Sequence, residues 1–252
     1  MSSSEIVTAA ILVIGDEILS GRTKDKNIGY IADYLTAIGI DLKEVRVVSD
    51  DETAVVSALN ALRSTYTYVF TTGGIGPTHD DITADCIAKA FGVTIDYDPR
   101  AVAILEERMA KSGNVMNEAR MRMTRIPKGA DLVLNKVSGA PGFWIGNVIV
   151  MAGVPSIMQA MLDEVAPKLK TGTKLISETI RADAKEGDLG TELGAVAKLH
   201  PDTIIGSYPF FDEALGPNTN IVVRSRDADK LAAARAAVEA MLKTVKARLL
   251  RQ

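Results

Sequence analysis

The sequence predicts an α/β fold in which a mostly parallel sheet carries helices on both faces, with a small α+β domain after it. Three observations support this prediction. Apolar runs that suit buried strands alternate with segments of helical spacing through the first part of the chain. Glycine-rich or acidic loops follow the first three of these runs. Beyond about residue 170 the order changes to strand, helix, strand, strand, helix.

The first predicted element is a near-continuous apolar run at residues 8–14, which is typical of a strand buried on both faces. Apolar residues at helical spacing, followed by a glycine, predict a helix at 27–38. The next predicted elements are a strand at 42–48, a helix at 52–63, a strand at 67–71 and a helix at 81–91. Because strands joined through helices run parallel, this order predicts a parallel sheet.

Predicted helices and strands no longer alternate one by one in the next part of the chain. The predicted elements there are a helix at 98–112, a short helix at 117–123, strands at 131–134, 142–145 and 147–151, and a helix that opens at Pro155. Lys170–Thr173 is the expected hinge, so we expect two domains, at residues 6–170 and 171–252. The second domain is predicted to contain strands at 174–180, 203–207 and 220–225 and helices at 186–199 and 227–250.

Composition excludes several classes of function. The chain has 252 residues, of which 47% are hydrophobic and 24% charged, the balance of an ordinary folded protein. A net charge of −3 gives no basic surface for nucleic acid. No apolar run reaches the ~20 residues that a membrane helix needs. With Cys86 as the only cysteine and no visible secretory leader, we expect no disulfide, no membrane and a cytoplasmic location.

Residues 71–85 are the most informative segment. Three glycines, at 73, 74 and 76, follow a strand and precede Pro77 and the pair Asp80-Asp81. Glycines let the main chain approach a ligand closely, and a helix that begins after such a loop offers unpaired N–H groups to an anion. The alternative is a plain strand-to-helix turn. With the two aspartates, the segment predicts a site for a phosphorylated small molecule, with a cation between the negative charges.

The acidic residues have alternative roles. Asp80 or Asp81 is expected to cap the helix that follows, which leaves the other free for a hard cation such as Mg²⁺. Asp51 is expected to cap its own helix, and Asp50 to face the pocket. Because ligands bind at the carboxyl ends of parallel strands, these loops and Gly15-Asp16-Glu17 are expected to converge on one pocket.

Four segments, Ile14–Gly21, Thr71–Asp81, Ala140–Phe143 and Gly153–Ser156, resemble the MoaB/Mog-type molybdopterin-binding family. The version they resemble stands at the N-terminus of CinA (competence/damage-inducible) proteins. The match covers about residues 6–168, and residues 174–250 resemble the small middle domain of the same proteins. The amidase domain that ends full CinA proteins is missing here, so deamidation is not expected.

The resemblance implies a three-layer α/β/α sandwich. It also implies metal-dependent hydrolysis of a pyrophosphate-bearing nucleotide such as ADP-ribose or FAD. The alternatives are molybdopterin binding or adenylylation, and a non-catalytic nucleotide-binding sensor or scaffold. The expected ligand is therefore a nucleotide or a pterin, with Mg²⁺, Mn²⁺ or Co²⁺ as the divalent metal. Relatives of this type form oligomers, which implies a homodimer or a higher homo-oligomer.

The resemblance also implies the site residues. Asp81 matches the aspartate of the family motif, so we expect it to bind the metal and to act in catalysis with Asp50. The expected ligand-binding residues are Gly15, Asp16, Glu17, Ser20, Gly21, Thr72, Gly73, Gly74, Gly76, Pro77, Thr78, Asp80, Asn117, Gly139, Ala140, Pro141, Gly142, Gly153, Pro155 and Ser156. Of the basic residues Arg120, Arg122 and Arg125, at least two are expected to be solvated, whereas one could reach a phosphate.

Overall fold

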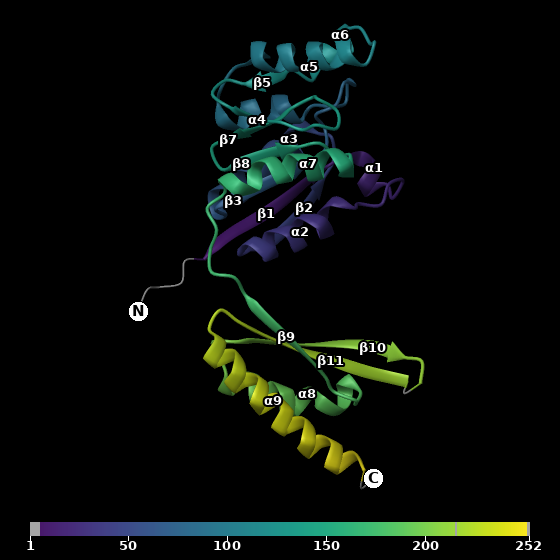
Figure 1. Cartoon of the computed structure of the whole chain (residues 1–252), viewed down its shortest axis with the longest axis vertical. Helices are drawn as coiled ribbons and strands as arrows, with labels where there is room; N and C mark the ends of the chain where they lie inside the picture. The colour runs from purple at the N-terminus through teal and green to yellow at the C-terminus, as the bar shows by residue number, and fades with distance from the viewer. Residues whose placement is uncertain (1–5, 215, 251–252) are drawn as a thin grey trace. The chain divides into compact units, whose positions relative to one another are not determined.

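The computed structural model describes residues 6–214 and 216–250. They cluster into two units, one that ends at Gly172 and one that begins at Thr173 (Figure 1). Each unit has a hydrophobic core of its own.

The first unit is built on a six-stranded sheet. Its strands, in spatial order, are β2 (Ile40–Val48), β1 (Val7–Ile14), β3 (Tyr68–Thr72), β8 (Val148–Met151), β7 (Gly142–Ile145) and β6 (Asp131–Val133). The pairs β1–β2, β1–β3 and β3–β8 are parallel, whereas β7 is antiparallel to β8 and to β6. The expectation of a mostly parallel sheet is therefore confirmed, with an antiparallel edge built from the predicted hairpin at Gly146-Asn147.

Alternating side chains of β1 enter two separate cores. Ala10, Leu12 and Ile14 pack on one face of the sheet, whereas Ala9, Ile11 and Val13 pack on the other. The first face is covered by α3 (Glu52–Thr65), α4 (Thr83–Phe91) and α5 (Pro99–Lys111), and the second by α2 (Asn27–Ile38) and α7 (Pro155–Val165) (Figure 1). The predicted three-layer α/β/α sandwich is confirmed.

Helix α4 begins two residues later than predicted. Its N-cap is Ile82, which makes no side-chain capping bond, so the expectation that Asp80 or Asp81 caps this helix is wrong. The physical reason is that the Asp81 carboxylate turns back towards Thr78. By contrast, Asp51 accepts a bond from the N–H of Ala54 and caps α3 as expected.

Four short elements escaped prediction. They are α1 (Asp16–Leu19), β4 (Ile95–Tyr97), β5 (Arg125–Pro127) and the 3₁₀ turn Ala166–Lys168. Elements of three or four residues are too short to show a periodicity. The predicted short helix near 117–123 is present as α6 (Glu118–Arg122).

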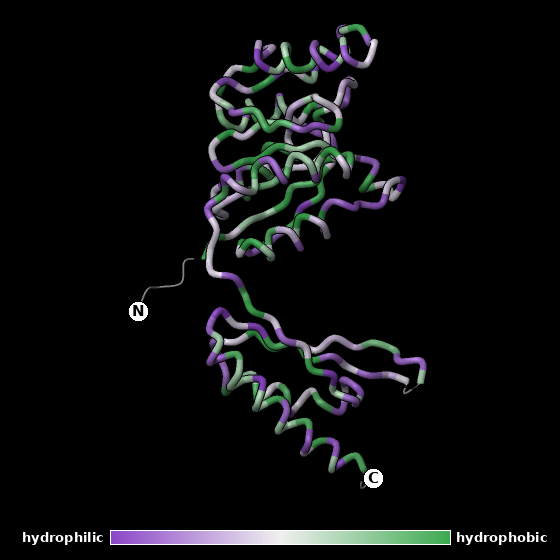
Figure 2. The backbone as a smooth tube through the Cα atoms, viewed as in Figure 1, coloured by the Kyte–Doolittle hydropathy of each residue, from purple (hydrophilic) through white to green (hydrophobic). Residues whose placement is uncertain are grey.

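The second unit is the expected small α+β domain. Its antiparallel sheet has the order β10 (Ile204–Asp212), β11 (Gly216–Ser225), β9 (Ile176–Arg181). Helices α8 (Glu186–Leu199) and α9 (Ala228–Leu249) pack on it, and α9 alternates hydrophilic and hydrophobic residues along its length (Figure 2). Strands β10 and β11 extend beyond the predicted 203–207 and 220–225, and β10 is an edge strand, where Pro209 is tolerated.

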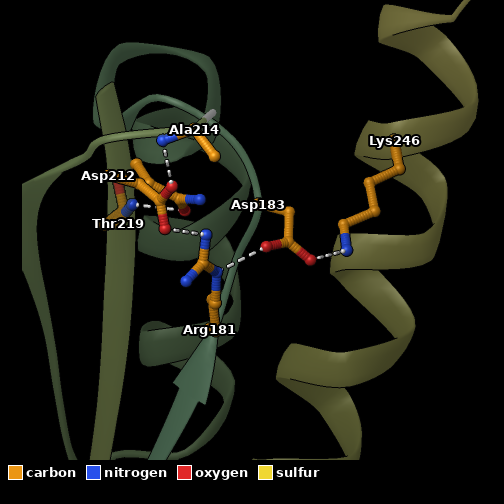
Figure 3. Close-up of polar contacts among 7 residues, drawn as sticks. Arg181, Asp183, Asp212, Ala214, Thr219 and Lys246 are labelled. Atoms are coloured by element: carbon orange, nitrogen blue, oxygen red, sulfur yellow. Dashed lines mark hydrogen bonds and ion pairs between the residues drawn. The ribbon is translucent and has the colours of Figure 1, made fainter. Parts of the chain in front are cut away.

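An ion-pair cluster ties β9 to its neighbours in this unit. Arg181 donates from Nε to Asp183 at 2.8 Å and from a terminal nitrogen to Asp212 at 2.7 Å, and Lys246 of α9 donates to Asp183 at 3.0 Å (Figure 3). Asp183 is the only described non-glycine residue with a positive φ, 49°. The ion pairs of Asp183 therefore stabilise a backbone conformation that most non-glycine residues disfavour.

Candidate functional site

The carboxyl ends of β1, β3 and β8 open onto a cavity of about 530 Å³. Among the residues predicted to bind ligand or metal, those that line it are Glu17, Gly73, Gly74, Gly76, Pro77, Asp81, Ala140, Pro141, Gly153 and Pro155. The cavity thus brings together loops from four distant parts of the sequence, at the edge of the sheet where parallel α/β folds bind ligands.

Close packing explains the first two glycines of the loop. A Cβ on Gly73 would lie 2.1 Å from the carbonyl oxygen of Ile14, and one on Gly74 would lie 2.2 Å from the hydroxyl of Thr83. Both glycines have positive φ, 100° and 65°. Thr83, at the start of α4, donates its hydroxyl to Gly73 O at 3.0 Å and its N–H to Gly74 O at 2.9 Å. The loop therefore packs closely against β1 and is hydrogen-bonded to α4.

The main chain of this loop leaves three consecutive donors unused. The N–H groups of Gly74, Ile75 and Gly76 have no hydrogen-bond partner among the residues that the structure describes. All three residues line the cavity. Successive free N–H groups in a turn form an anion-binding concavity. This segment can therefore bind a phosphate oxygen without any basic side chain.

Asp81 stands beside these donors. One of its carboxylate oxygens, Oδ2, accepts from the N–H of Thr78 at 2.8 Å and from the Thr78 hydroxyl at 2.6 Å. The other oxygen, Oδ1, has no partner in the described part of the chain. A Cβ on Gly76 would lie 2.6 Å from Oδ2, so the third glycine makes room for this carboxylate.

Asp50 does not line this cavity, although it lies close to residues that border it. Its carboxylate accepts from the N–H of Asp16 at 2.9 Å, which joins the ends of β1 and β2. Burial is the largest cause that raises the pKa of Asp50 above its usual value. The negative charges of Asp16, Glu17 and Asp80 raise this pKa further, against the effect of the N–H bond. The β1 and β2 ends therefore form an acidic group.

The three arginines of the basic stretch have different surroundings. Arg125 forms a two-bond ion pair with Asp85, at 2.7 and 2.6 Å, and Arg120 donates to the carbonyl of Val115. Arg122 has no side-chain partner among the described residues, and its Nε is buried. It lines a small hollow together with Gly76 and Asp81. Arg122 is therefore the arginine placed to meet an anion at the glycine loop.

Asn135 organises the loop that forms the opposite wall. Its Oδ1 accepts from the N–H groups of Val137 and Ser138, at 3.1 and 2.7 Å, and its Nδ2 donates to Ala140 O at 2.6 Å. Sequence reasoning did not single out Asn135, and no motif marks it. It is a positioning residue, because it holds the segment that presents Ser138, Ala140 and Pro141 to the cavity.

The apolar wall was also missed. Leu105 and Met109 of α5, Met123 after α6, and Ile157 and Met161 of α7 line the cavity. In the sequence these side chains have the spacing of ordinary core residues, so periodicity cannot separate them from the core. Thr23 also lines the cavity, from the segment between α1 and α2.

The other predicted residues lie outside this cavity. They are Gly15, Asp16, Ser20, Gly21, Asp50, Thr72, Thr78, Asp80, Asn117, Gly139, Gly142 and Ser156. Asn117 caps α6 by accepting from the N–H of Arg120 at 2.9 Å. A Cβ on Gly139 would lie 2.7 Å from Arg108, and one on Gly142 would lie 2.2 Å from Val150 O. These two glycines serve close packing.

Two further observations concern metal and membrane. No group of three or more His, Cys, Asp or Glu side chains that could hold a metal ion occurs within residues 6–214 and 216–250. Within these ranges, none of the helices combines the length and the apolar character that a membrane span requires.

Cys86 is buried in the core, and burial raises the pKa of its thiol to about 12, which makes it a poor nucleophile.

Two family models match the chain. The model described as "Probable molybdopterin binding domain" matches residues 10–171, and the model described as "FAD synthase, middle domain" matches residues 174–248. A protein of Archaeoglobus fulgidus without a functional name is 32% identical over 199 residues, which is 79% of this chain and 84% of that protein.

Two named relatives are longer than this chain. A "Probable FAD synthase" of Caenorhabditis briggsae is 29% identical and a "CinA-like protein" of Gemmatimonas aurantiaca is 32% identical, over 93% and 75% of this chain. The matches span 49% and 47% of those proteins. The crystal structure of the protein CinA of unknown function from Thermoplasma acidophilum is 32% identical, with a TM-score of 0.60 over 65% of this chain and 98% of that one.

Proposed function

The chain belongs to the family of probable molybdopterin-binding domains, and on that premise we propose that its N-terminal unit binds a pyrophosphate-bearing nucleotide and hydrolyses it with a divalent metal ion. The proposed substrates are nucleotides such as ADP-ribose and FAD. The observation that carries the proposal is the row of three free N–H groups at Gly74, Ile75 and Gly76, beside the unpartnered Oδ1 of Asp81.

The roles of the residues follow from their chemistry. The free N–H groups bind phosphate oxygens, and Arg122 offsets their charge from the neighbouring hollow. The apolar wall around Leu105 and Met109 takes a flat ring such as a base or a flavin. The carboxylates of Glu17 and Asp81 also line the cavity and would repel the phosphates. A cation is therefore needed between carboxylate and phosphate.

The residues present fit a hard divalent cation. Carboxylate oxygens are the ligands that Mg²⁺ and Mn²⁺ prefer, and Mg²⁺ is often held by one or two carboxylates together with substrate phosphates and water. Asp81, through Oδ1, and Glu17 would hold it, since both line the cavity. The cation would neutralise charge that develops on the pyrophosphate under attack by water.

The test uses the full chain with ADP-ribose or FAD and Mg²⁺, Mn²⁺ or Co²⁺. We expect release of AMP, and we expect Asp81→Asn to lower turnover about 100-fold or more while the protein stays folded. Folded wild-type protein that releases no AMP with any of the three metals would contradict the hydrolase. An Asp81→Asn variant that turns over like the wild type would remove Asp81 from the reaction.

A second candidate function is molybdopterin binding or adenylylation, which the name of the family model favours. An apolar cavity beside an anion-binding loop also suits a phosphorylated pterin. Tighter binding of molybdopterin than of ADP-ribose would support it. A third candidate is a nucleotide-binding sensor or scaffold. Tight nucleotide binding without turnover, unchanged in Asp81→Asn, would support the sensor.

We also propose that the chain forms a homodimer or a higher homo-oligomer, on the resemblance to its relatives. The molar mass in solution, measured by light scattering, tests this. A mass near 26.9 kDa across the concentration range would contradict it.

A further inference from the structure

A second, smaller compartment adjoins the main cavity. Its volume is about 240 Å³, and it shares Glu17, Thr23, Gly73, Gly153 and Pro155 with the main cavity. We call it the Thr72 compartment. Its remaining lining residues are Val13, Ile14, Ile18, Lys24, Asp25, Lys26, Asn27 and Thr72. The glycine loop therefore borders both spaces, through Gly73.

Two buried polar side chains in the wall of this compartment lack a partner. Asn27 is 4% exposed, and its Nδ2 donates to Gly153 O at 2.8 Å, whereas its Oδ1 accepts from no described residue. Thr72 is 1% exposed, and its Oγ1 has no partner either. Buried polar atoms are nearly always hydrogen-bonded, so two such atoms in one wall call for an explanation.

The chemistry of these atoms selects the kind of group that would satisfy them. The bond to Gly153 O fixes Nδ2 as the donor, so Asn27 Oδ1 can only accept. A phosphate oxygen, which is also an acceptor, would be repelled there, whereas a hydroxyl group would donate. Thr72 Oγ1 can donate or accept, so neighbouring hydroxyls would satisfy both atoms.

The two spaces also differ in character. The main cavity has the apolar side chains of Leu105, Met109 and Met161 in its wall, whereas the non-shared wall near Asn27 combines apolar residues with charged and polar ones such as Lys24 and Asp25. A ligand with an apolar ring at one end, phosphates in the middle and a hydroxylated sugar at the other end matches this arrangement.

We propose that the Thr72 compartment binds the hydroxyl-bearing sugar end of the nucleotide, through Thr72 Oγ1 and Asn27 Oδ1. The proposal rests on the proposed function, because it assumes that the phosphates lie at the glycine loop. ADP-ribose would then bind with its terminal ribose in this compartment, and ADP, which lacks that ribose, would leave the compartment empty.

The chain offers a matched pair of variants. Thr72→Val removes the unpartnered hydroxyl at nearly constant volume and keeps a residue that favours strands. Thr71→Val is the control, because Thr71 is 0% exposed, also has an unpartnered Oγ1, is the neighbour on β3 and lines neither space. Successive residues of a strand point to opposite faces.

Calorimetric titration of the full chain in Mg²⁺ with the α,β-methylene analogues of ADP-ribose and ADP, which cannot be cleaved at the pyrophosphate and are named below by their parent nucleotides, tests the proposal. We expect ADP-ribose to bind more tightly than ADP, and Thr72→Val to lose about tenfold in affinity for ADP-ribose and under twofold for ADP. Thr71→Val should bind both ligands like the wild type. Thermal unfolding checks that both variants are folded, and Thr72→Ser should restore binding.

The outcomes separate this proposal from the proposed function. Wild-type protein that binds neither ligand contradicts both. Equal affinity of the wild type for ADP and ADP-ribose overturns the sugar assignment alone. A folded Thr72→Val protein that binds ADP-ribose as the wild type does also overturns the sugar assignment, because the unpartnered atoms then bind buried water.

Discussion

Thr78 donates both its main-chain N–H and its hydroxyl to the same carboxylate oxygen of Asp81, at 2.8 and 2.6 Å. The two donors fix one oxygen and leave the other oxygen free. The partners are three positions apart on the chain, so this geometry is a local property of the loop before α4. Under the proposed function Thr78 is a positioning residue, which acts through Asp81 rather than on the ligand.

The first prediction concerns the hydroxyl of Thr78. Thr78→Val removes one of the two bonds to Asp81 while the main-chain bond remains, so the carboxylate gains freedom. We expect kcat for AMP release to fall about tenfold with little change in affinity for an uncleavable α,β-methylene nucleotide in Mg²⁺. Thr78→Ser, which keeps a hydroxyl, should retain most of the turnover. Equal losses in the two variants would show that the hydroxyl does not position Asp81.

The second prediction concerns the space beside Asp81. Gly76→Ala places a Cβ 2.6 Å from Oδ2 of Asp81, at a φ that alanine tolerates, so the carboxylate must move. Because small misplacements of a catalytic group are costly, we expect turnover to fall about 10- to 100-fold without loss of the fold. Gly29→Ala is the control, since a Cβ in that helix meets nothing within 4 Å. It should keep full activity. Full activity in Gly76→Ala would contradict the importance of this carboxylate position.

The third prediction follows from the raised pKa of Asp50. A carboxyl whose pKa is higher in the folded state favours folding in its neutral form, and this contribution is lost as pH rises through the folded pKa. At pH 7 the ionised Asp50 therefore destabilises the fold. Asp50→Asn should raise the melting temperature at pH 7 by about 1–2 °C, and the gain should shrink as the pH approaches 4.

Asp51→Asn is the control for this effect. It removes a neighbouring charge, but asparagine caps helices as well as aspartate does, so α3 keeps its N-cap. The gain expected for Asp50→Asn should be absent in this variant. An Asp50→Asn protein that melts below the wild type at pH 7 would contradict the electrostatic account.

The fourth prediction concerns Asp183 in the second unit. Lys246 and Arg181 lower the pKa of this carboxyl to about 2 from its usual 3.8. Its contribution to stability is therefore present above pH 3.8 and is lost as the pH falls through 2. Because the side chain is 46% exposed, solvent screens the pairs and we expect a contribution of only about 0.5–1 kcal/mol.

Asp183→Asn tests this contribution, because asparagine tolerates the φ of 49° and only the charge is lost. We expect faster hydrogen exchange in β9 and α9 at neutral pH, in the full chain. In 1 M salt, which screens exposed pairs, the difference from the wild type should shrink. An unchanged exchange rate at low salt would assign no stabilising role to the cluster.

The sequence could predict the features that depend on the direction of the chain and on the periodicity of its apolar residues. Apolar runs joined by helical segments fix a parallel sheet, and that sheet places the ends of β1 and β3 at one edge, where Glu17 and Asp81 both border the cavity. The role of Asp81 as a metal ligand remains a prediction. The glycines were predicted to let the main chain approach a ligand, which remains a prediction, whereas the close contact found for Gly73 is with the carbonyl oxygen of Ile14.

The rest depends on contacts that no period or motif encodes. Met123 and Leu105 have core spacing in the sequence, yet both lie in the cavity wall. The capping of α4 by Asp80 or Asp81 was predicted wrongly, because the choice between a helix cap and a bond to Thr78 depends on loop geometry. Asn135 holds its loop through local bonds that any asparagine in a turn could form.

Gly153 packs against Gly73 so closely that a Cβ on it would lie 3.3 Å from the Gly73 Cα, and its carbonyl accepts the amide of Asn27. The motif at residues 71–85 is therefore synthesised long before the segment that closes around it. Until β8 pairs with β3, the growing chain presents β3 as an open edge and its glycine loop lacks a wall. Ligand binding should thus appear late during translation, once residues 148–165 have left the ribosome.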